Sequence, residues 1–106
     1  AEMKETEIYE IIDGFVNAAV VCKEGGFTGV QIHAAHGYLI SQFLSPITNK
    51  RSDRWGGSIE NRSRILREIV SKVRAAVGTE FPIAVKLNSA DFQRGGFDEN
   101  DSLEVI

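Results

Sequence analysis

The sequence predicts an α/β fold with a parallel sheet, and three observations support this prediction. Predicted helices and strands alternate along the chain, and a further helix begins near Glu99. Such alternation is typical of parallel sheets whose strands are connected by helices. The first strand is followed by a long connection, and both strands place a polar side chain near their carboxyl end. Two strands leave both edges of a sheet open, so we interpret the chain as a section of a larger fold.

The first predicted helix covers residues 5–24 and is followed by a predicted strand over about residues 29–34. Gly25 and Gly26 end the helix, because glycine tolerates the left-handed conformations found there. The strand is short, apolar and partly β-branched. Apolar residues at steps of three and four draw one stripe along the helix. This stripe consists of Ile8, Ile11, Ile12, Phe15, Ala18, Ala19 and Cys22.

A second helix is predicted from Ser58, its N-cap, to Gly78, where it stops. Glu60 in its first turn is favourable at a helix N-terminus. Pro82 then opens a second strand over about residues 82–88. The apolar stripe of this helix consists of Leu66, Ile69, Val70, Val73 and Val77.

The alternation of side chains along a strand predicts which residues share a face. Val30 and Ile32 share one face of the first strand, and His33 lies on the other. On the second strand, Lys86 lies opposite the apolar face, which consists of Ile83, Val85 and Leu87. Helices must cover the apolar faces, so we expect His33 and Lys86 to point to the other side. In a closed barrel that side is the interior, and active sites lie at the carboxyl ends of its strands, which favours a barrel over a doubly wound sheet.

The composition restricts the class of protein. The chain has 106 residues, 42% hydrophobic and 25% charged, which suits one soluble globular domain or part of one. A net charge of −3 argues against broad attraction to nucleic acid, and no apolar run approaches a membrane span. The acidic N-terminus is unlike a signal peptide, and Cys22 is the only cysteine. We therefore expect a cytoplasmic protein that has no membrane or nucleic-acid partner.

The connection over roughly residues 35–58 is much longer than is usual in such folds. Both histidines of the chain, His33 and His36, stand at its start, followed by Tyr38. The segment RSDRWGGS follows, in which Arg51 and Asp53 can pair with each other and with Arg54. We predict an ordered loop over the mouth of the barrel, with a short helical turn at residues 39–44.

Three interpretations of the histidine pair remain open at this point. Zinc normally requires three or four protein ligands, and Asp53 would be the only further candidate in the loop. Alternatively, both histidines are structural and have their hydrogen bonds satisfied in a core. In the third interpretation, His33 and His36 hold an oxygen atom on which negative charge develops, and Tyr38 delivers a proton. Lys86 on the next strand would then stabilise an anionic cofactor ring.

Three segments carry a family resemblance: GVQIHAAHGYLISQFLSP, NKRSDRWGGSIENRSRILREIV and VKLNSADF, in this order. Together they resemble the old yellow enzyme family of FMN-dependent NAD(P)H:flavin oxidoreductases. The resemblance spans about residues 10–100, nearly the whole chain. It is strongest to the bacterial-type ene-reductases and to the NADH:flavin oxidoreductase and dienoyl-CoA reductase branches.

This resemblance implies a TIM (β/α)8 barrel, of which residues 1–106 would be one partial domain, with no second domain. The segment would run from the helix before strand four, through strand four, its long loop and helix, to strand five and the start of the next helix. FMN and NAD(P)H are the implied cofactors, with hydride passing from NAD(P)H to FMN. A small α,β-unsaturated molecule, an enone or enoyl compound, is the implied substrate.

The resemblance also implies a role for each residue of the motif. His33 and His36 match the pair that binds the substrate carbonyl above the flavin, where other members have asparagine at the second position. Tyr38 matches the tyrosine that protonates the carbon α to the carbonyl. Lys86 matches the basic residue against the flavin N1 and C2 oxygen, and His33 also belongs to the cofactor site. Arg62, like Arg51, is expected to anchor the loop.

We expect the 106-residue chain alone to show little FMN binding and no useful turnover, because the other strands of the barrel are absent from it. Two alternatives from other classes accompany this expectation. The chain alone would be a non-catalytic assembly or folding unit that forms homo-oligomers through its open strand edges. A weaker alternative is a metal-dependent hydrolase that uses His33, His36 and Asp53.

Overall fold

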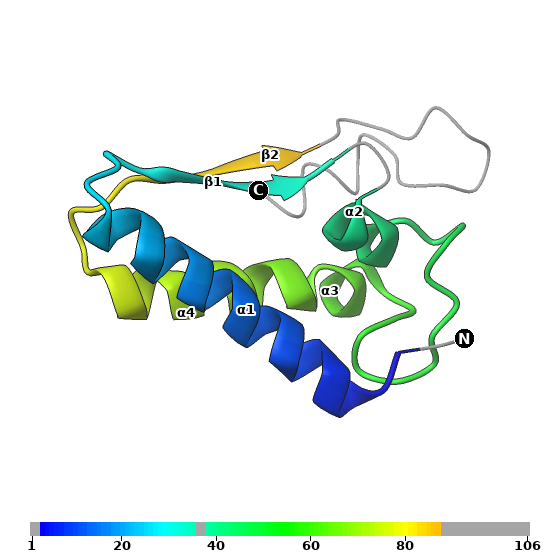
Figure 1. The fold of residues 1–106 in the computed structure, drawn as a ribbon. Coiled ribbons are helices and arrows are strands. Elements are labelled where there is room, and N and C mark those ends of the chain that lie inside the picture. Colours follow the sequence, from blue (N-terminus) through cyan, green and yellow to red (C-terminus); the bar gives the residue numbers. More distant parts are fainter. Residues whose placement is uncertain (1–2, 36–37, 88–106) are drawn as a thin grey trace. The chain divides into compact units, whose positions relative to one another are not determined.

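The computed structural model describes residues 3–35 and 38–87 (Figure 1). The helix predicted near Glu99 lies outside these residues. The described elements are α1 (Glu5–Glu24), β1 (Val30–Ala34), α2 (Leu39–Leu44), α3 (Ile59–Arg62), α4 (Arg64–Val77) and β2 (Ile83–Leu87). None of the described helices has the length and apolar character needed to cross a membrane.

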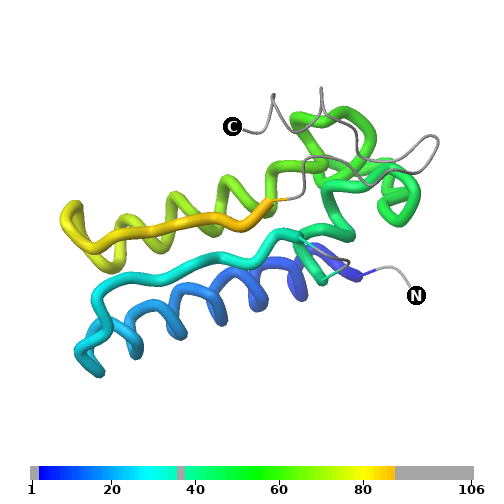
Figure 2. Tube along the Cα trace, turned by 90° about the horizontal axis from the view of Figure 1, so that it is seen from above, coloured from blue at the N-terminus to red at the C-terminus, as the bar shows by residue number. Residues whose placement is uncertain are grey.

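The chain divides into two compact units. The first contains Ala1–Ile32 and Arg67–Val85, and the second contains His33–Leu66 and Lys86–Ile106. In the first unit, α1 and α4 lie side by side along the same face of the two strands (Figures 1 and 2). This arrangement is the partial α/β fold that the alternation of elements predicts.

Helix α1 has the bounds that its sequence pattern predicts, Glu5–Glu24. The backbone N–H of Lys4 donates a hydrogen bond of 3.0 Å to the Glu7 carboxylate, which satisfies a free donor at the helix start. The C-cap is Gly25, and Gly26 follows with a φ of 89°. The buried positions of the predicted stripe are Ile8, Ile12 and Ala19.

Strands β1 and β2 form a two-stranded sheet and run parallel. At its start the Val30 N–H donates a hydrogen bond of 3.0 Å to the carbonyl of Pro82. Gly29 allows this close approach, since a Cβ there would lie 3.0 Å from the Pro82 oxygen and 3.1 Å from its Cβ. The strands therefore start side by side, and their register is fixed at this point.

The second predicted helix is interrupted, so the prediction of one continuous helix was wrong. Helix α3 ends at Arg62 and α4 begins at Arg64, with Ser63 between them as the C-cap of α3. The Ser63 hydroxyl donates a hydrogen bond of 3.2 Å to the carbonyl of Glu60. Serine side chains compete in this way with helical hydrogen bonds, which accounts for the break. As predicted, Ser58 is an N-cap, and its hydroxyl accepts a hydrogen bond from the Asn61 N–H at 3.2 Å.

Helix α4 buries the stripe that its spacing predicts, with Val70 half-buried. Its buried residues in the first unit are Ile69, Val73 and Val77. The helix ends before Gly78, which has a φ of 90°. The Arg74 guanidinium donates hydrogen bonds to the carbonyls of Gly78 (2.8 Å) and Phe81 (2.7 Å), and so fixes the turn into β2.

Candidate functional site

His33 and Tyr38, two of the predicted site residues, are in contact in the second unit. Their ring centroids lie 4.6 Å apart with planes inclined by 47°. His33 is the fourth residue of β1, and Tyr38 is the N-cap of α2. Tyr38 is 62% exposed. His36 lies outside the described residues.

The strand register puts Lys86 beside His33. In a parallel ladder, a residue that donates to the carbonyl of residue j−1 is paired with residue j. The bond from Val30 to Pro82 therefore pairs Val30 with Ile83, and three residues further along it pairs His33 with Lys86. Both side chains fall on the same face of the sheet, opposite to the buried Ile32. His33, which is in contact with Tyr38, is thus paired with Lys86 near the point where the two strands end.

The predicted strand faces agree with the burial pattern of β1, but only in part with that of β2, where Ile83 and Leu87 are half-buried and Val85 is exposed. Ile32 and Ala34 are buried on one face of β1, whereas Gln31 on the other is exposed. On β2, Lys86 is exposed as predicted. Val85 is 38% exposed, more than a position under a helix would be. Within the described residues, β1 is the only strand that pairs with β2. The other edge of β2 is open, which leaves Val85 more exposed.

The chemistry of this donor set fits a flavin ring. Lys86 offers three N–H donors and a full positive charge, which suit a ring that becomes anionic when it is reduced. His33 and Tyr38 offer donors that can bind an oxygen atom. These residues supply no phosphate-binding loop, so they would contact the ring and a molecule bound beside it.

Asp53 belongs to an ion pair in the loop. Its carboxylate oxygens accept hydrogen bonds from the Arg51 guanidinium at 2.6 and 3.1 Å, and from the Trp55 N–H at 3.1 Å. The hydrogen bond from Arg51 is the main reason that the pKa of Asp53 lies below its usual value of 3.8. The predicted pairing of Arg51 with Asp53 is confirmed, while the guanidinium of Arg54 lies 5.3 Å from the Trp55 ring centroid.

The metal interpretation has no support from the described residues. Within 3–35 and 38–87, no group of three His, Cys, Asp or Glu side chains is placed to hold a metal ion. The Asp53 carboxylate, its only loop candidate, is engaged by Arg51.

Arg62 anchors the loop, as predicted. Its side chain is buried, with the residue only 6% exposed. Its Nη1 donates a hydrogen bond of 2.6 Å to the carbonyl of Leu44, and its Nε donates one of 3.1 Å to the carbonyl of Gly57. The guanidinium thus joins the end of α2 to the start of α3.

Sequence reasoning missed Asn49, which organises the middle of the loop. Its buried amide donates to the carbonyls of Phe43 (2.7 Å) and Trp55 (2.8 Å), and its oxygen accepts from the Arg51 N–H (3.1 Å). The only signal was its position after the turn-forming segment SPIT. Gly56 packs against this centre, since a Cβ there would lie 2.8 Å from the Asn49 oxygen.

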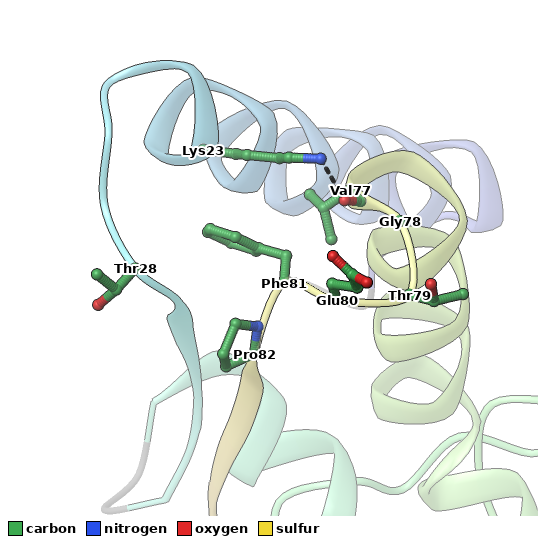
Figure 3. Close-up of a pocket in the computed structure, with 8 residues that line it drawn as sticks. All are labelled: Lys23, Thr28, Val77, Gly78, Thr79, Glu80, Phe81 and Pro82. Atoms are coloured by element: carbon green, nitrogen blue, oxygen red, sulfur yellow. Dashed lines mark hydrogen bonds between the residues drawn. The ribbon is translucent and has the colours of Figure 1, made fainter.

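A pocket of about 390 Å3 lies in the first unit (Figure 3). Its lining residues precede the strands, whereas His33 and Lys86 lie near the strand ends. The Lys23 ammonium donates a hydrogen bond of 2.6 Å to the carbonyl of Val77, so it caps α4. The lining consists of Lys23, Thr28, Val77, Gly78, Thr79, Glu80, Phe81 and Pro82. This lining shows a helix cap and a turn, without a catalytic grouping.

Comparison with known proteins gives close relatives. The NADH oxidase of Thermoanaerobacter brockii is 47% identical over 95 residues, which are 90% of this chain and 15% of that protein. The NADPH dehydrogenase of Bacillus subtilis is 43% identical over 102 residues, 96% of this chain and 30% of that protein. The chain therefore spans less than a third of the length of these relatives.

Solved structures agree with these relatives. A 2-naphthoyl-CoA reductase in complex with 2-naphthoyl-CoA matches 99% of this chain and 16% of its own, with a TM-score of 0.96 and 45% identity. The old yellow enzyme homologue from Zymomonas mobilis matches 94% of this chain and 28% of its own, with a TM-score of 0.82 and 39% identity. The resemblance to old yellow enzyme inferred from the motifs is confirmed.

The family model for the NADH:flavin oxidoreductase / NADH oxidase family matches residues 1–106. Members of this family are flavoprotein oxidoreductases that use FMN, with NADH or NADPH as hydride donor. The chain belongs to the NADH:flavin oxidoreductase / NADH oxidase family.

Proposed function

We propose that this chain is part of an FMN-dependent oxidoreductase that takes hydride from NAD(P)H and reduces an activated C=C bond of the enone or enoyl type. In this proposal residues 1–106 are one partial domain of a TIM barrel, from the helix before strand four to the start of the helix after strand five. The similarity to a 2-naphthoyl-CoA reductase complex supports an acyl-thioester or related carbonyl substrate.

The observation that carries the proposal is the grouping of His33, Tyr38 and Lys86. The two rings are in contact at 4.6 Å, and the register pairs His33 with Lys86 on the next strand. All three lie near the carboxyl ends of parallel strands, where barrel enzymes have their active sites.

When bound, FMN would supply the hydride chemistry. His33 and His36 would donate hydrogen bonds to the substrate oxygen and stabilise the negative charge that develops on it. Tyr38 would give its hydroxyl proton to the carbon α to the carbonyl. Lys86, with His33, would contact the flavin ring near N1 and the C2 oxygen and favour its anionic form.

An FMN titration of the complete enzyme that carries this segment tests the proposal. We expect Lys86→Ala to weaken FMN binding by roughly tenfold or more, because an ion pair with the flavin ring is lost. Lys72→Ala is the matched control, since Lys72 is an exposed lysine on α4 beside Tyr9. Equal affinity in both variants would overturn the assignment of Lys86.

The open sheet supports a second candidate for the isolated chain, a non-catalytic unit that assembles through its strand edges. The described sheet has two strands only, so each has one edge without a neighbour. We expect the mass of the 106-residue chain in solution to rise with concentration. A monomer at all concentrations would exclude this candidate.

A further inference from the structure

Helix α2 has only six residues, Leu39–Leu44, and a helix of that length is not stable by itself in water. It begins at Tyr38, whose carbonyl accepts the first helical hydrogen bond, from the Gln42 N–H at 2.9 Å. The backbone that carries the candidate proton donor is thus continuous with this helix. A contact that holds α2 in place therefore also holds the backbone of Tyr38, from which the phenol extends.

The carboxyl end of α2 is held by a complete set of donors. The last four carbonyls of a helix have no partner inside it. Here Ser41 accepts from the Ser45 N–H (3.1 Å), and Gln42 accepts from the Thr48 hydroxyl (2.6 Å). The other two carbonyls, those of Phe43 and Leu44, accept from the side chains of Asn49 (2.7 Å) and Arg62 (2.6 Å).

Arg62 is the member of this set that comes from outside the loop. It belongs to α3, is buried, and also holds the carbonyl of Gly57. Its hydrogen bond to Leu44 links residues 18 positions apart, whereas the other three bonds are local. A planar guanidinium directs its hydrogen bonds more rigidly than an ammonium group does. Arg62 therefore ties α2 to the scaffold of α3.

We propose that Arg62 is a positioning residue for Tyr38: it holds the carboxyl end of α2 so that the phenol stays against His33, in place to deliver its proton. The inference rests on the proposed function of Tyr38. Six helical residues span only about 9 Å, so the helix moves as a short rigid rod. If its carboxyl end shifts, its amino end and Tyr38 shift by a comparable distance. Displacement of a reacting group by about 1 Å slows a reaction up to roughly 100-fold.

The test compares Arg62→Lys with Arg64→Lys in the complete enzyme. Arg64 is a matched control, since its guanidinium bonds the carbonyl of Arg54 and the side chain of Asn61, not α2. We expect Arg62→Lys to slow reoxidation of the reduced enzyme by a cyclic enone by roughly 10- to 100-fold. Reoxidation by ferricyanide, which needs no proton from Tyr38, should be unchanged.

A double-mutant cycle with Tyr38→Phe separates positioning from general damage. Arg62→Lys should have no further effect on the enone rate in the Tyr38→Phe protein, because no hydroxyl remains to position. The Tyr38 ring signal in a tyrosine-labelled NMR spectrum, assigned by its loss in Tyr38→Phe, should shift in Arg62→Lys and stay in Arg64→Lys. If Arg62→Lys does not fold, Thr48→Val removes the exposed bond to Gln42 and should give a smaller loss of the same kind.

The outcomes distinguish two failures. An unchanged enone rate in Tyr38→Phe would overturn the proposed role of Tyr38, and with it the inference. A slow Tyr38→Phe enzyme with a normal Arg62→Lys enzyme, or with fully additive effects of the two changes, would overturn the positioning role alone.

Discussion

Both units of this chain bury apolar side chains, but they differ in their buried polar side chains. In the first, α1 and α4 bury stripes of isoleucine and valine, with Ile8, Ile12 and Ile69 fully buried. The second contains every buried polar side chain of the described residues: Ser41, Ser45, Asn49, Arg62 and Ser63. Several of these donate to backbone carbonyls. The second unit also buries apolar side chains, including Ile40, Leu44 and Trp55. Apolar burial therefore supports both units, and in the second unit directional hydrogen bonds also fix the loop that follows the first strand.

The largest expected effect tests the apolar core of the first unit. Ile69→Ala removes a fully buried side chain from α4 and leaves a cavity, which should lower the free energy of unfolding by about 2–5 kcal/mol. Val21→Ala, on the exposed surface of α1, is the control and should change it by less than about 0.5 kcal/mol. Urea denaturation of the complete protein measures both, and similar values would contradict the placement of the core.

The next effect tests the buried hydrogen bonds of the second unit. Asn49→Asp keeps the shape of the side chain but replaces the amide donor, so the carbonyls of Phe43 and Trp55 lose their partner. The free energy of unfolding should fall by about 1–3 kcal/mol. Asn17→Asp, at an exposed position of α1, should leave the free energy of unfolding nearly unchanged. Equal stability of the two variants in urea would show that Asn49 does not organise the loop.

Two glycines sharpen the comparison, because replacing them with alanine should change the free energy of unfolding in opposite directions. Gly57 in the loop has a φ of 93°, which strains any other L-residue, so Gly57→Ala should destabilise by about 1 kcal/mol. Gly14 lies inside α1 with nothing within 4 Å of an added Cβ, so Gly14→Ala should stabilise by about 0.5–1 kcal/mol. Thermal melting of the two variants checks the signs; a stabilised Gly57→Ala would contradict the loop conformation.

The smallest effect concerns pH. The pKa of Asp53 is lowered in the folded chain, mainly by the hydrogen bond from Arg51, so the folded state binds this proton less tightly than the unfolded state. The resulting stability is present above pH 3.8, the unfolded value, and is lost as the pH falls through the lower folded pKa. Asp53 is 45% exposed, so the effect is small and screened by salt. Asp53→Asn should reduce the loss between pH 5 and pH 3 in urea titrations, and an unchanged profile would contradict the ion pair.

The apolar scaffold was predictable because burial repeats with the period of each element. This period gave α1 its bounds, and the strand positions to within two residues. The break at Ser63 was not predictable, because its cause is one hydroxyl bonded to the carbonyl of Glu60, and the predicted stripe begins only at Leu66. Hydrogen bonds of side chains leave no periodic signal, so the apolar pattern does not reveal them.

The candidate site was predictable where it depends on strand parity. Lys86 falls beside His33 by register alone, and Tyr38 reaches His33 because α2 starts directly after it. The donors that hold α2, above all Asn49, were missed because their partners are backbone carbonyls, which every residue has. Arg62 was predicted as an anchor, but its partner Leu44 lies 18 residues away and only the fold brings them together.

One measurement tests the central claim most directly: the rate at which a cyclic enone reoxidises the reduced Tyr38→Phe enzyme, beside Tyr9→Phe. Tyr9 is the other tyrosine of this chain, on α1, and is the matched control. We predict a rate lower by roughly 100-fold or more in Tyr38→Phe, with FMN content unchanged, and a normal rate in Tyr9→Phe. A normal rate in Tyr38→Phe would contradict the assignment of the site.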